Sequence, residues 1–272
     1  MSPEQPGEGT QPFGAVRRPT GIGSSERDTA LTTKGVKRMR ILTKLGLATA
    51  TITVVALGMT LPADAITVSQ VKAAQTRLNR LGCTAGPVDG KAGAMTQAAT
   101  VRFQAANVLS QTGSLSSTTY SRLMASTAKR CDVRAVPRRS GTGRRIVISQ
   151  TQNWVWLIDA RGKIVRQGGI IDNPTYLKAG NYTSGAKCGR AARIRKNTDG
   201  ASLYLNNFVR FAPCGVGFHQ IPTYKSNGQQ IHADWLLGTN YRASHGCIRV
   251  SASMSVAIWS FAAGATRVVV MR

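Results

Sequence analysis

The sequence predicts a multidomain protein: a small three-helix domain, then a mainly β domain whose sheet is sandwich- or barrel-like with one or two helices. The length of 272 residues exceeds what one ordinary domain needs. Within residues 66–131, apolar residues recur at helical spacing. From Ile146 onward, β-branched and aromatic residues come in short runs separated by polar turns.

The first 65 residues read as segments that precede the folded domains. Residues 1–38 are polar and rich in Gly, Pro and Ser, which predicts a disordered tail. Residues 39–65 have the order of a secretory signal peptide: basic residues, the uncharged run Leu45–Leu61, then Ala63-Asp64-Ala65. We therefore expect export, with Met39 as a candidate true start.

Cleavage after Ala65 would make Ile66 the mature N-terminus. The alternative is an uncleaved membrane anchor, which would leave residues 1–38 in the cytoplasm. The apolar run holds 17 residues, fewer than the ~20 that a membrane span needs, so cleavage is the prediction.

Three helices are expected within residues 66–131. The first carries an apolar stripe at spacings of 3, 4 and 3 and ends at Gly82, the second repeats that spacing, and Ser117 or Thr118 can cap the third. The residues that carry the three stripes are Val71, Ala74, Leu78 and Leu81; Ala99, Phe103 and Ala106; and Tyr120, Leu123 and Met124. Residues 132–144 contain Pro, Gly and several Arg without apolar periodicity, and we expect a linker there.

Residues 145–272 predict the β domain. Its first strands should form two successive hairpins around polar turns, and Ser251–Phe261 should be a helix with Ser251 as its N-cap. The expected strands are Ile146–Ile148, Trp154–Ile158, Ile164–Val165, Ser202–Leu205, Val209–Phe211, Val216–Ile221 and Thr266–Val270. There is no Gly-rich phosphate loop in the sequence, which argues against nucleotide chemistry.

The charge suits a polyanionic partner. The whole chain carries 36 Lys plus Arg against 11 Asp plus Glu, and after Ala65 the sequence has 28 Lys plus Arg, six Asp and no Glu. The basic residues are scattered and no groove-reading motif is present, so we expect no nucleic-acid partner. An anionic polymer outside the cell fits better.

Five cysteines follow the apolar run, and an oxidising compartment favours pairs. The economical arrangement is two disulfides, Cys83–Cys131 and Cys188–Cys214, with Cys247 free. An inert buried thiol or an intermolecular bridge remains the alternative for Cys247.

Histidine is the side chain that most often activates a cysteine nucleophile, and this chain has three: His219, His232 and His245. His245 lies two residues before Cys247, which on an extended strand places both on one face. Proximity alone therefore makes His245 a candidate base. Gly246 lets the backbone approach a substrate closely.

Within residues 66–131, the pattern Gln75-x-x-Leu78-x-x-Leu81-Gly82 precedes a Val88-Asp89-Gly90 loop, with Thr96, Ala99 and Phe103-Gln104 after it. This segment resembles the peptidoglycan-binding type 1 domain. The resemblance implies binding to the cell wall. One departure is Ala92, which stands where the family commonly has an aromatic residue.

The run Ser244-His245-Gly246-Cys247-Ile248-Arg249 matches the signature of the L,D-transpeptidase (YkuD-type) catalytic domain, and the earlier His219-Gln220-Ile221-Pro222 resembles its His-x-x-Pro segment. The resemblance implies that Cys247 is the nucleophile and that His219, rather than His245, is its base. It further implies that the Gln220 carbonyl orients His219, that amides around Gly246 and Cys247 stabilise an oxyanion, that Ser244 and His245 support the site, and that Arg249 helps to hold substrate.

The resemblance implies acyl transfer without a cofactor. Cys247 would form a thioester with a peptidoglycan stem peptide, and an amine from a second stem would resolve it to a 3-3 crosslink. Partners would be stem peptides, glycan and anionic wall polymers, and the location would be the cell wall. The gap from His219 to Cys247 is longer than in many members, and residues 173–182 match the family only loosely.

Three alternatives stay open. Water as acceptor would make an L,D-carboxypeptidase. His219, His232, Asp234 and His245 could instead ligate zinc, although their spacing fits no clear frame and His232 reads as an exposed loop residue. The protein could also bind the wall without catalysing a reaction.

Overall fold

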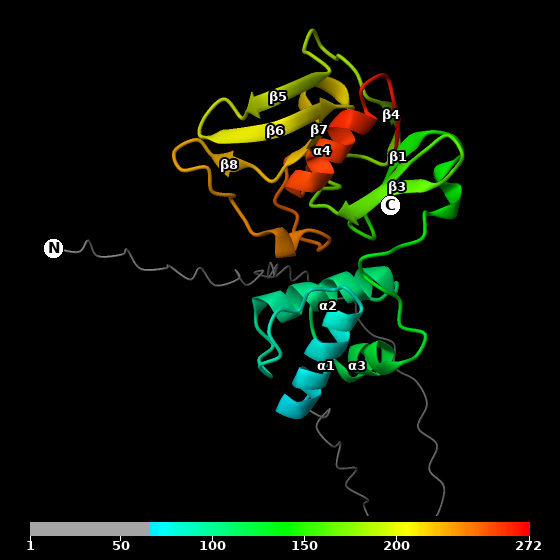
Figure 1. Ribbon diagram of the computed structural model, residues 1–272, viewed down its shortest axis with the longest axis vertical. Coiled ribbons are helices and arrows are strands. Elements are labelled where there is room, and N and C mark those ends of the chain that lie inside the picture. The colour runs from blue at the N-terminus through cyan, green and yellow to red at the C-terminus, as the bar shows by residue number, and fades with distance from the viewer. Residues whose placement is uncertain (1–65) are drawn as a thin grey trace, which may run out of the picture. The chain divides into compact units, whose positions relative to one another are not determined.

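The computed structural model describes residues 66–272. The expected tail and signal peptide, residues 1–65, lie outside this part of the chain. Figure 1 shows helices α1–α3 followed by a strand-rich region that contains the helix α4, so the predicted multidomain fold class is confirmed. Between residues 66 and 272, no helix is long and apolar enough to cross a membrane.

The helical domain consists of α1 (Val68–Arg80), α2 (Ala94–Ala106) and α3 (Ser117–Met124). Its core contains most residues of the predicted stripes, and Leu78, Phe103 and Leu123 are fully buried in it. Met124, expected in the third stripe, is exposed instead. The third helix is capped by Ser116, whose side chain accepts from Thr119 N, and not by Ser117 or Thr118 as expected. Sequence spacing fixes a helix start only to within a residue or two.

A disulfide joins Cys83 to Cys131 across this domain, which is the pairing that the cysteine count favoured. Both half-cystines are buried, and Cys131 N donates to Leu81 O at 2.9 Å. The two cysteines are 48 residues apart in the sequence. A loop of that size restricts the unfolded chain enough to stabilise a small core by about 3–4 kcal/mol.

Gln75 explains why the Val88-Asp89-Gly90 loop has a fixed shape. The Gln75 side chain is 1% exposed. Its Nε2 donates to Asp89 Oδ1 at 2.8 Å and to Lys91 O at 3.0 Å, while its Oε1 accepts from Gly90 N at 2.9 Å. This buried amide is satisfied on both sides, so the motif residues hold the loop to α1.

The second domain contains two five-stranded sheets. In the first, the order is β3-β2-β1-β10-β4, and in the second it is β5-β6-β7-β9 with β8 paired to β6. The strands are β1 (Arg145–Ser149), β2 (Trp154–Ile158), β3 (Ile164–Gly169), β4 (Gly180–Thr183), β5 (Arg193–Thr198), β6 (Leu203–Arg210), β7 (Gly217–Gln220), β8 (Thr223–Tyr224), β9 (Ile248–Val250) and β10 (Arg267–Met271).

Both sheets are mixed rather than purely antiparallel. β1, β2 and β3 form the two expected hairpins, but β1 pairs parallel with β10, and β7 pairs parallel with β9. The apolar core includes residues from both sheets, such as Ile148, Val209 and Phe218, together with α4 (Ala252–Phe261). Ser251 caps α4 as expected, accepting from Met254 N.

The two strands expected at Ser202–Leu205 and Val209–Phe211 are a single strand, β6. Asn206 and Asn207 lie between the two expected strands, and asparagine is depleted in strands. Asn207 does adopt a left-handed φ of +53°, but its amide is held by Ser255 Oγ at 2.9 Å and the strand continues. Strands β4, β5, β8 and β9 were not expected, because they are short or polar.

The segment expected to be a linker, residues 132–144, packs against the β domain. Arg134 is 4% exposed, and its carbonyl accepts from Trp156 Nε1 at 2.9 Å. Arg102 of α2 adds a second link, because its guanidinium donates to Cys83 O and Thr84 O in its own domain and to Trp235 O and Leu237 O in the other. Burial lowers the pKa of Arg102 to about 10.

Candidate active site

The second sheet places Cys247 and His219 on one face. Phe218 pairs with Ile248, and His219 pairs with Arg249, in the parallel ladder between β7 and β9. Phe218 and Ile248 are both fully buried in the core. Because side chains alternate between the faces of a sheet, His219 and Arg249 point to the opposite face, and so does Cys247, the residue directly before Ile248.

His219 is held in one tautomer. Its Nδ1 lies 2.6 Å from Gln220 O, and a carbonyl can only accept, so Nδ1 carries the proton and Nε2 is left as the acceptor. The ring is 2% exposed and stacks on Phe208 with centroids 6.3 Å apart. Burial lowers the pKa of His219 to about 4, and Arg249 and His232 add to that lowering. The imidazole is therefore neutral at physiological pH.

Cys247 is the free cysteine among the described residues, and its side chain is partly exposed. The thiol donates a hydrogen bond to Gly215 O at 3.5 Å. Burial raises the pKa of the Cys247 thiol, which the positive charges of Arg249 and Arg210 partly offset. In this resting arrangement both the thiol and the imidazole are neutral, so no preformed thiolate–imidazolium pair is present.

The second disulfide lies next to this thiol. Cys188 pairs with Cys214, as the cysteine count favoured. Cys214 directly precedes Gly215, whose carbonyl accepts from Cys247. The bridge therefore fixes the loop that contacts the thiol.

The Ser244-His245-Gly246 segment is a tight turn and not an extended strand, which corrects the basis on which His245 was a candidate base. Ser244 Oγ accepts from Gly246 N at 3.1 Å and donates to Cys247 O. Gly246 has a φ of +112°, a conformation that L side chains rarely adopt. His245 is exposed, and its ring faces Tyr176 with centroids 5.7 Å apart.

Of the two amides expected to stabilise an oxyanion, that of Gly246 already donates to Ser244. Arg249, expected to hold substrate, donates from Nη2 to Ala243 O at 2.7 Å, and its backbone pairs with Ile171. It therefore braces the strand end as well as placing a positive charge near Cys247. The expected roles of these groups toward substrate stay predictions.

An ion pair that the sequence did not reveal holds the segment before this turn. Asp172 is fully buried, and its carboxylate pairs with Arg242 and accepts from Gln150 Nε2 at 2.9 Å. Burial raises the pKa of Asp172, and the charge of Arg242 opposes that rise. The sequence feature that could have indicated a buried carboxylate is the position of Asp172 directly after the apolar pair Ile170–Ile171.

His232 does not lie in open solvent, and the expectation of an exposed loop residue was wrong. It is half-buried, its Nδ1 donates to Ala233 O at 3.2 Å, and its ring meets Tyr241 edge-on at 5.9 Å. Its Nε2 is buried without a hydrogen-bond partner in the structure described. Burial lowers the pKa of His232, and Arg249 adds to that effect.

The suggested zinc ligands do not come together. Within residues 66–272, no three side chains of His, Cys, Asp or Glu gather in a way that could hold a metal ion. His219 is enclosed beside Phe208, whereas His245 is exposed beside Tyr176. Cys247 and His219, by contrast, share one face of the second sheet.

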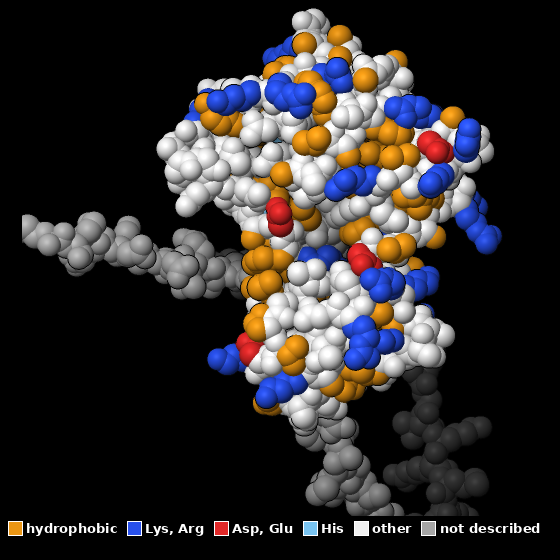
Figure 2. Space-filling model, in the orientation of Figure 1, with side chains coloured by type: hydrophobic (Ala, Val, Ile, Leu, Met, Phe, Trp, Pro, Cys, Tyr) orange, Lys and Arg blue, Asp and Glu red, His pale blue; other side chains and the backbone are white. Residues whose placement is uncertain are grey.

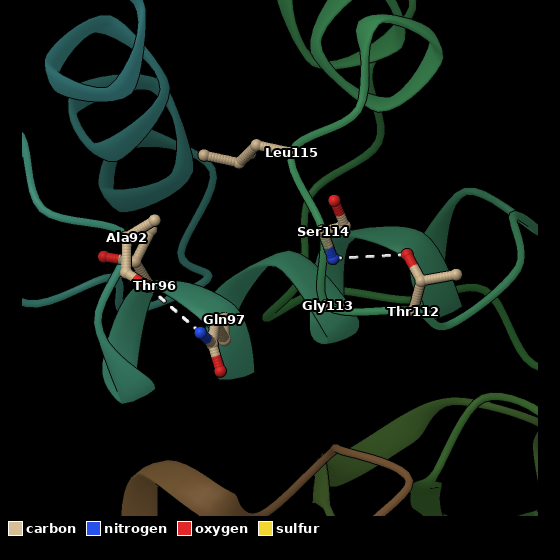
Figure 3. A pocket seen from close by; sticks show the side chains of 7 residues that line it. All are labelled: Ala92, Thr96, Gln97, Thr112, Gly113, Ser114 and Leu115. Atoms are coloured by element: carbon tan, nitrogen blue, oxygen red, sulfur yellow. Dashed lines mark hydrogen bonds between the residues drawn. The ribbon is translucent and has the colours of Figure 1, made fainter. Parts of the chain in front are cut away.

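The helical domain has a pocket of its own, of about 310 Å³, at the N-terminal end of α2. Figure 3 shows Gln97 donating to Ala92 O and Ser114 N donating to Thr112 on its two sides. Its lining is small and polar apart from Leu115. Ala92, the departure from the family pattern, lies on this pocket, so an aromatic side chain there would fill part of it.

Comparison with known proteins matches both domains to families. Residues 67–123 match the peptidoglycan binding domain, and residues 142–270 match the L,D-transpeptidase catalytic domain of the YkuD family. The chain therefore joins a peptidoglycan-binding domain to a YkuD-type L,D-transpeptidase catalytic domain. These two domains imply peptidoglycan as the substrate.

Solved structures include similar chains. An L,D-transpeptidase from Xylanimonas cellulosilytica is 23% identical, with 77% of this chain and 96% of that chain covered and a TM-score of 0.42. An L,D-transpeptidase from Stackebrandtia nassauensis is 18% identical, with 78% and 95% covered and a TM-score of 0.40. A fused Zn-dependent amidase/peptidase/peptidoglycan-binding domain-containing protein from Clostridium acetobutylicum is 18% identical, with 76% and 96% covered and a TM-score of 0.35. The comparison with curated proteins gave no match.

Proposed function

We propose that this protein is an L,D-transpeptidase that crosslinks peptidoglycan stem peptides through a thioester on Cys247. The supporting observation is the placement of a free, partly exposed Cys247 on the same sheet face as His219, whose Nε2 is an acceptor. A neutral imidazole of lowered pKa can take the thiol proton as the sulfur attacks.

The first half-reaction transfers the stem peptide to the enzyme. The Cys247 sulfur bonds to the carbonyl carbon of the third stem residue, and the thiol proton passes to His219 Nε2. The bond to the terminal D-amino acid breaks, and its nitrogen takes that proton from the imidazolium. The products are a thioester and a free D-amino acid, with His219 neutral again.

The second half-reaction resolves the thioester. An amine of a second stem attacks the same carbonyl carbon and gives its proton to His219. The carbon–sulfur bond breaks, the thiolate recovers the proton, and a 3-3 crosslink results. Water in place of the amine would give the shortened stem, which is the carboxypeptidase outcome.

We further propose that the protein acts outside the cell, in the wall. Two disulfides suit an oxidising compartment, and the excess of Lys and Arg suits anionic polymers there. Figure 2 shows basic side chains spread over both domains of the face drawn, with few acidic ones. N-terminal sequencing of the secreted protein should give Ile66 as the first residue, and a start before Met39 would contradict cleavage.

Muropeptides incubated with the purified protein and analysed by mass spectrometry test the activity. We expect 3-3 linked dimers and a transient mass increase on Cys247 equal to the mass of the stem minus that of the free D-amino acid released. Cys247→Ser should show neither, since a serine hydroxyl is far less ionised than a thiol beside a base. Shortened monomers without dimers would establish the carboxypeptidase instead, and unchanged muropeptides would refute both.

A further inference from the structure

A second pocket lies beside Cys247, on the outer side of the β5–β6 hairpin. Its volume is about 360 Å³, and its walls come from β5, β6 and the two loops that the Cys188–Cys214 disulfide joins. The lining side chains that matter are Arg190, Phe208 and Arg210, with Gly215 at one edge. The pocket is therefore basic, and the disulfide holds two of its walls.

Arg210 is unusual for a charged residue because it is 2% exposed. Its Nε donates to Ala191 O at 3.1 Å, and its guanidinium lies over the Phe208 ring at 5.0 Å. Its Nη1 is buried and has no acceptor in the described part of the chain. No carboxylate pairs with it there, and Arg190, a second cation, lines the same pocket. A buried guanidinium in this state lacks an anion.

The sheet register places Arg210 beside the nucleophile. Arg210 pairs with Gly217, and the next residue, Phe218, pairs with Ile248. Arg210, Gly217 and Cys247 therefore lie in one row across three strands, with the Arg210 and Cys247 side chains on the same face. At ~4.8 Å per strand, their Cα atoms are about 10 Å apart.

Glycine at position 217 keeps this row open. A Cβ there would lie 2.6 Å from both Phe208 Cζ and Val209 O, so only glycine fits at this place in the row beside the Phe208 ring. Gly215 connects the two places directly, because it lines the pocket and its carbonyl accepts from the Cys247 thiol.

We propose that this pocket binds the C-terminal carboxylate of the donor stem peptide, with Arg210 as its ligand. The inference rests on the proposed function. The carboxylate of the leaving residue is three bonds from the carbonyl carbon that the sulfur attacks, so it must lie close to Cys247. A carboxylate also matches the planar donor pattern of a guanidinium. Binding there selects stems that still carry their terminal D-amino acid and aligns the bond to be broken.

A time course of Cys247 acylation, measured by mass spectrometry, tests the proposed carboxylate site. Three donors are compared: a tetrapeptide stem, the same stem with a C-terminal amide, and a stem amidated only on the side-chain carboxylate of its third residue. A hydrogen bond to a charged group is worth roughly 10- to 100-fold in rate. We expect the protein to prefer the free acid over the C-terminal amide by that factor, with little effect of side-chain amidation.

Arg210→Gln removes a positive charge near the thiol and so slows both donors alike, but it should slow the free acid about 10- to 100-fold more than the C-terminal amide, so that the preference disappears. Arg210→Lys should retain part of the preference, because it keeps the charge but not the planar fork. Arg193→Gln is the matched control, since Arg193 stacks on Trp259 at 4.6 Å and does not line the pocket. It should keep the full preference. Melting temperatures check that each variant is folded.

Three results would overturn the proposal: equal rates for acid and C-terminal amide in the unmodified protein, equal losses on both donors in Arg210→Gln, or a dependence on side-chain amidation instead. A failure of the proposed function is distinguishable, because then no donor acylates Cys247. In that event, calorimetric binding of the tetrapeptide acid and amide to Cys247→Ala, with and without Arg210→Gln, decides the pocket's role. Binding that ignores the terminal carboxylate would refute it.

Discussion

Breaking the buried Asp172–Arg242 ion pair should destabilise the segment that leads into the Ser244–Gly246 turn before Cys247. Arg242→Met keeps most of the side-chain volume and removes the charge that faces Asp172, which is fully buried. Removing one partner of a buried pair costs about 3–5 kcal/mol. The Arg242 side chain is 32% exposed, so solvent screens part of the interaction and we expect about 2–3 kcal/mol.

Thermal unfolding measures this loss. A chain of this size loses about 2–4 °C of melting temperature per kcal/mol, which predicts a fall of about 4–12 °C at neutral pH. Acylation of Cys247 should fall as well, because Arg242 lies two residues before Ser244. The double variant Asp172→Asn with Arg242→Met should recover most of the stability, because an amide needs no counter-charge and can still accept from Gln150.

The stability lost in Arg242→Met should depend on pH, and the pKa of Asp172 sets the direction of that dependence. Burial raises the pKa of Asp172 in the folded protein, and removing Arg242 raises it further. A folded state that binds a proton more readily than the unfolded state gains stability as the pH falls. The difference in melting temperature between Arg242→Met and the unmodified protein should therefore shrink from pH 7.5 to pH 5. An unchanged difference, or a double variant no more stable than the single one, would refute the buried-charge argument.

Three further predictions concern the catalytic groups. His219→Ala should slow acylation by about 10²–10⁴. In the unmodified protein, the acylation rate should fall with decreasing pH near pH 4, since that is where the imidazole protonates. A fall near pH 6.5 would contradict the burial of His219. Gly246→Ala should nearly abolish acylation, because φ is +112° and the new Cβ would lie 3.2 Å from Val216 Cγ2; full activity in that variant would show that the turn is not required. EDTA should leave the acylation rate unchanged. If EDTA abolished the activity while Cys247→Ser kept it, a metal hydrolase would be favoured.

Features that depend on neighbouring residues could be predicted from the sequence. The Leu78 and Phe103 stripes follow from the 3.6-residue period, and the β1–β2–β3 meander follows from alternating runs and short polar turns. Ser251 was recognisable as a cap because capping is a contact over three residues. The N-cap of α3 was misplaced by one or two residues, since Ser116, Ser117 and Thr118 all have hydroxyl side chains that can cap a helix.

Pairings between distant segments had no such signal. The parallel pair β7–β9 joins strands about thirty residues apart, and nothing in the three residues of β9 indicates its partner. Asp172 and Arg242 are 70 residues apart, so their ion pair could not be inferred from charge patterning. His232 looked exposed because it lies in a polar stretch, but the position of Tyr241 against its ring is set by tertiary packing.

In the candidate site too, features set by neighbouring residues could be predicted from the sequence, whereas pairings between distant segments could not. The short run around Cys247 predicts which atom attacks, because nucleophile, turn and glycine are consecutive. The groups proposed to act with that atom come from elsewhere in the chain. Two ladders bring His219 and Arg210 to its face, and the Cys188–Cys214 disulfide fixes the loop that contains Gly215. Burial keeps the resting thiol and imidazole neutral. On the proposed mechanism, the thiol proton therefore passes to His219 as the sulfur attacks the carbonyl carbon and not before the substrate binds.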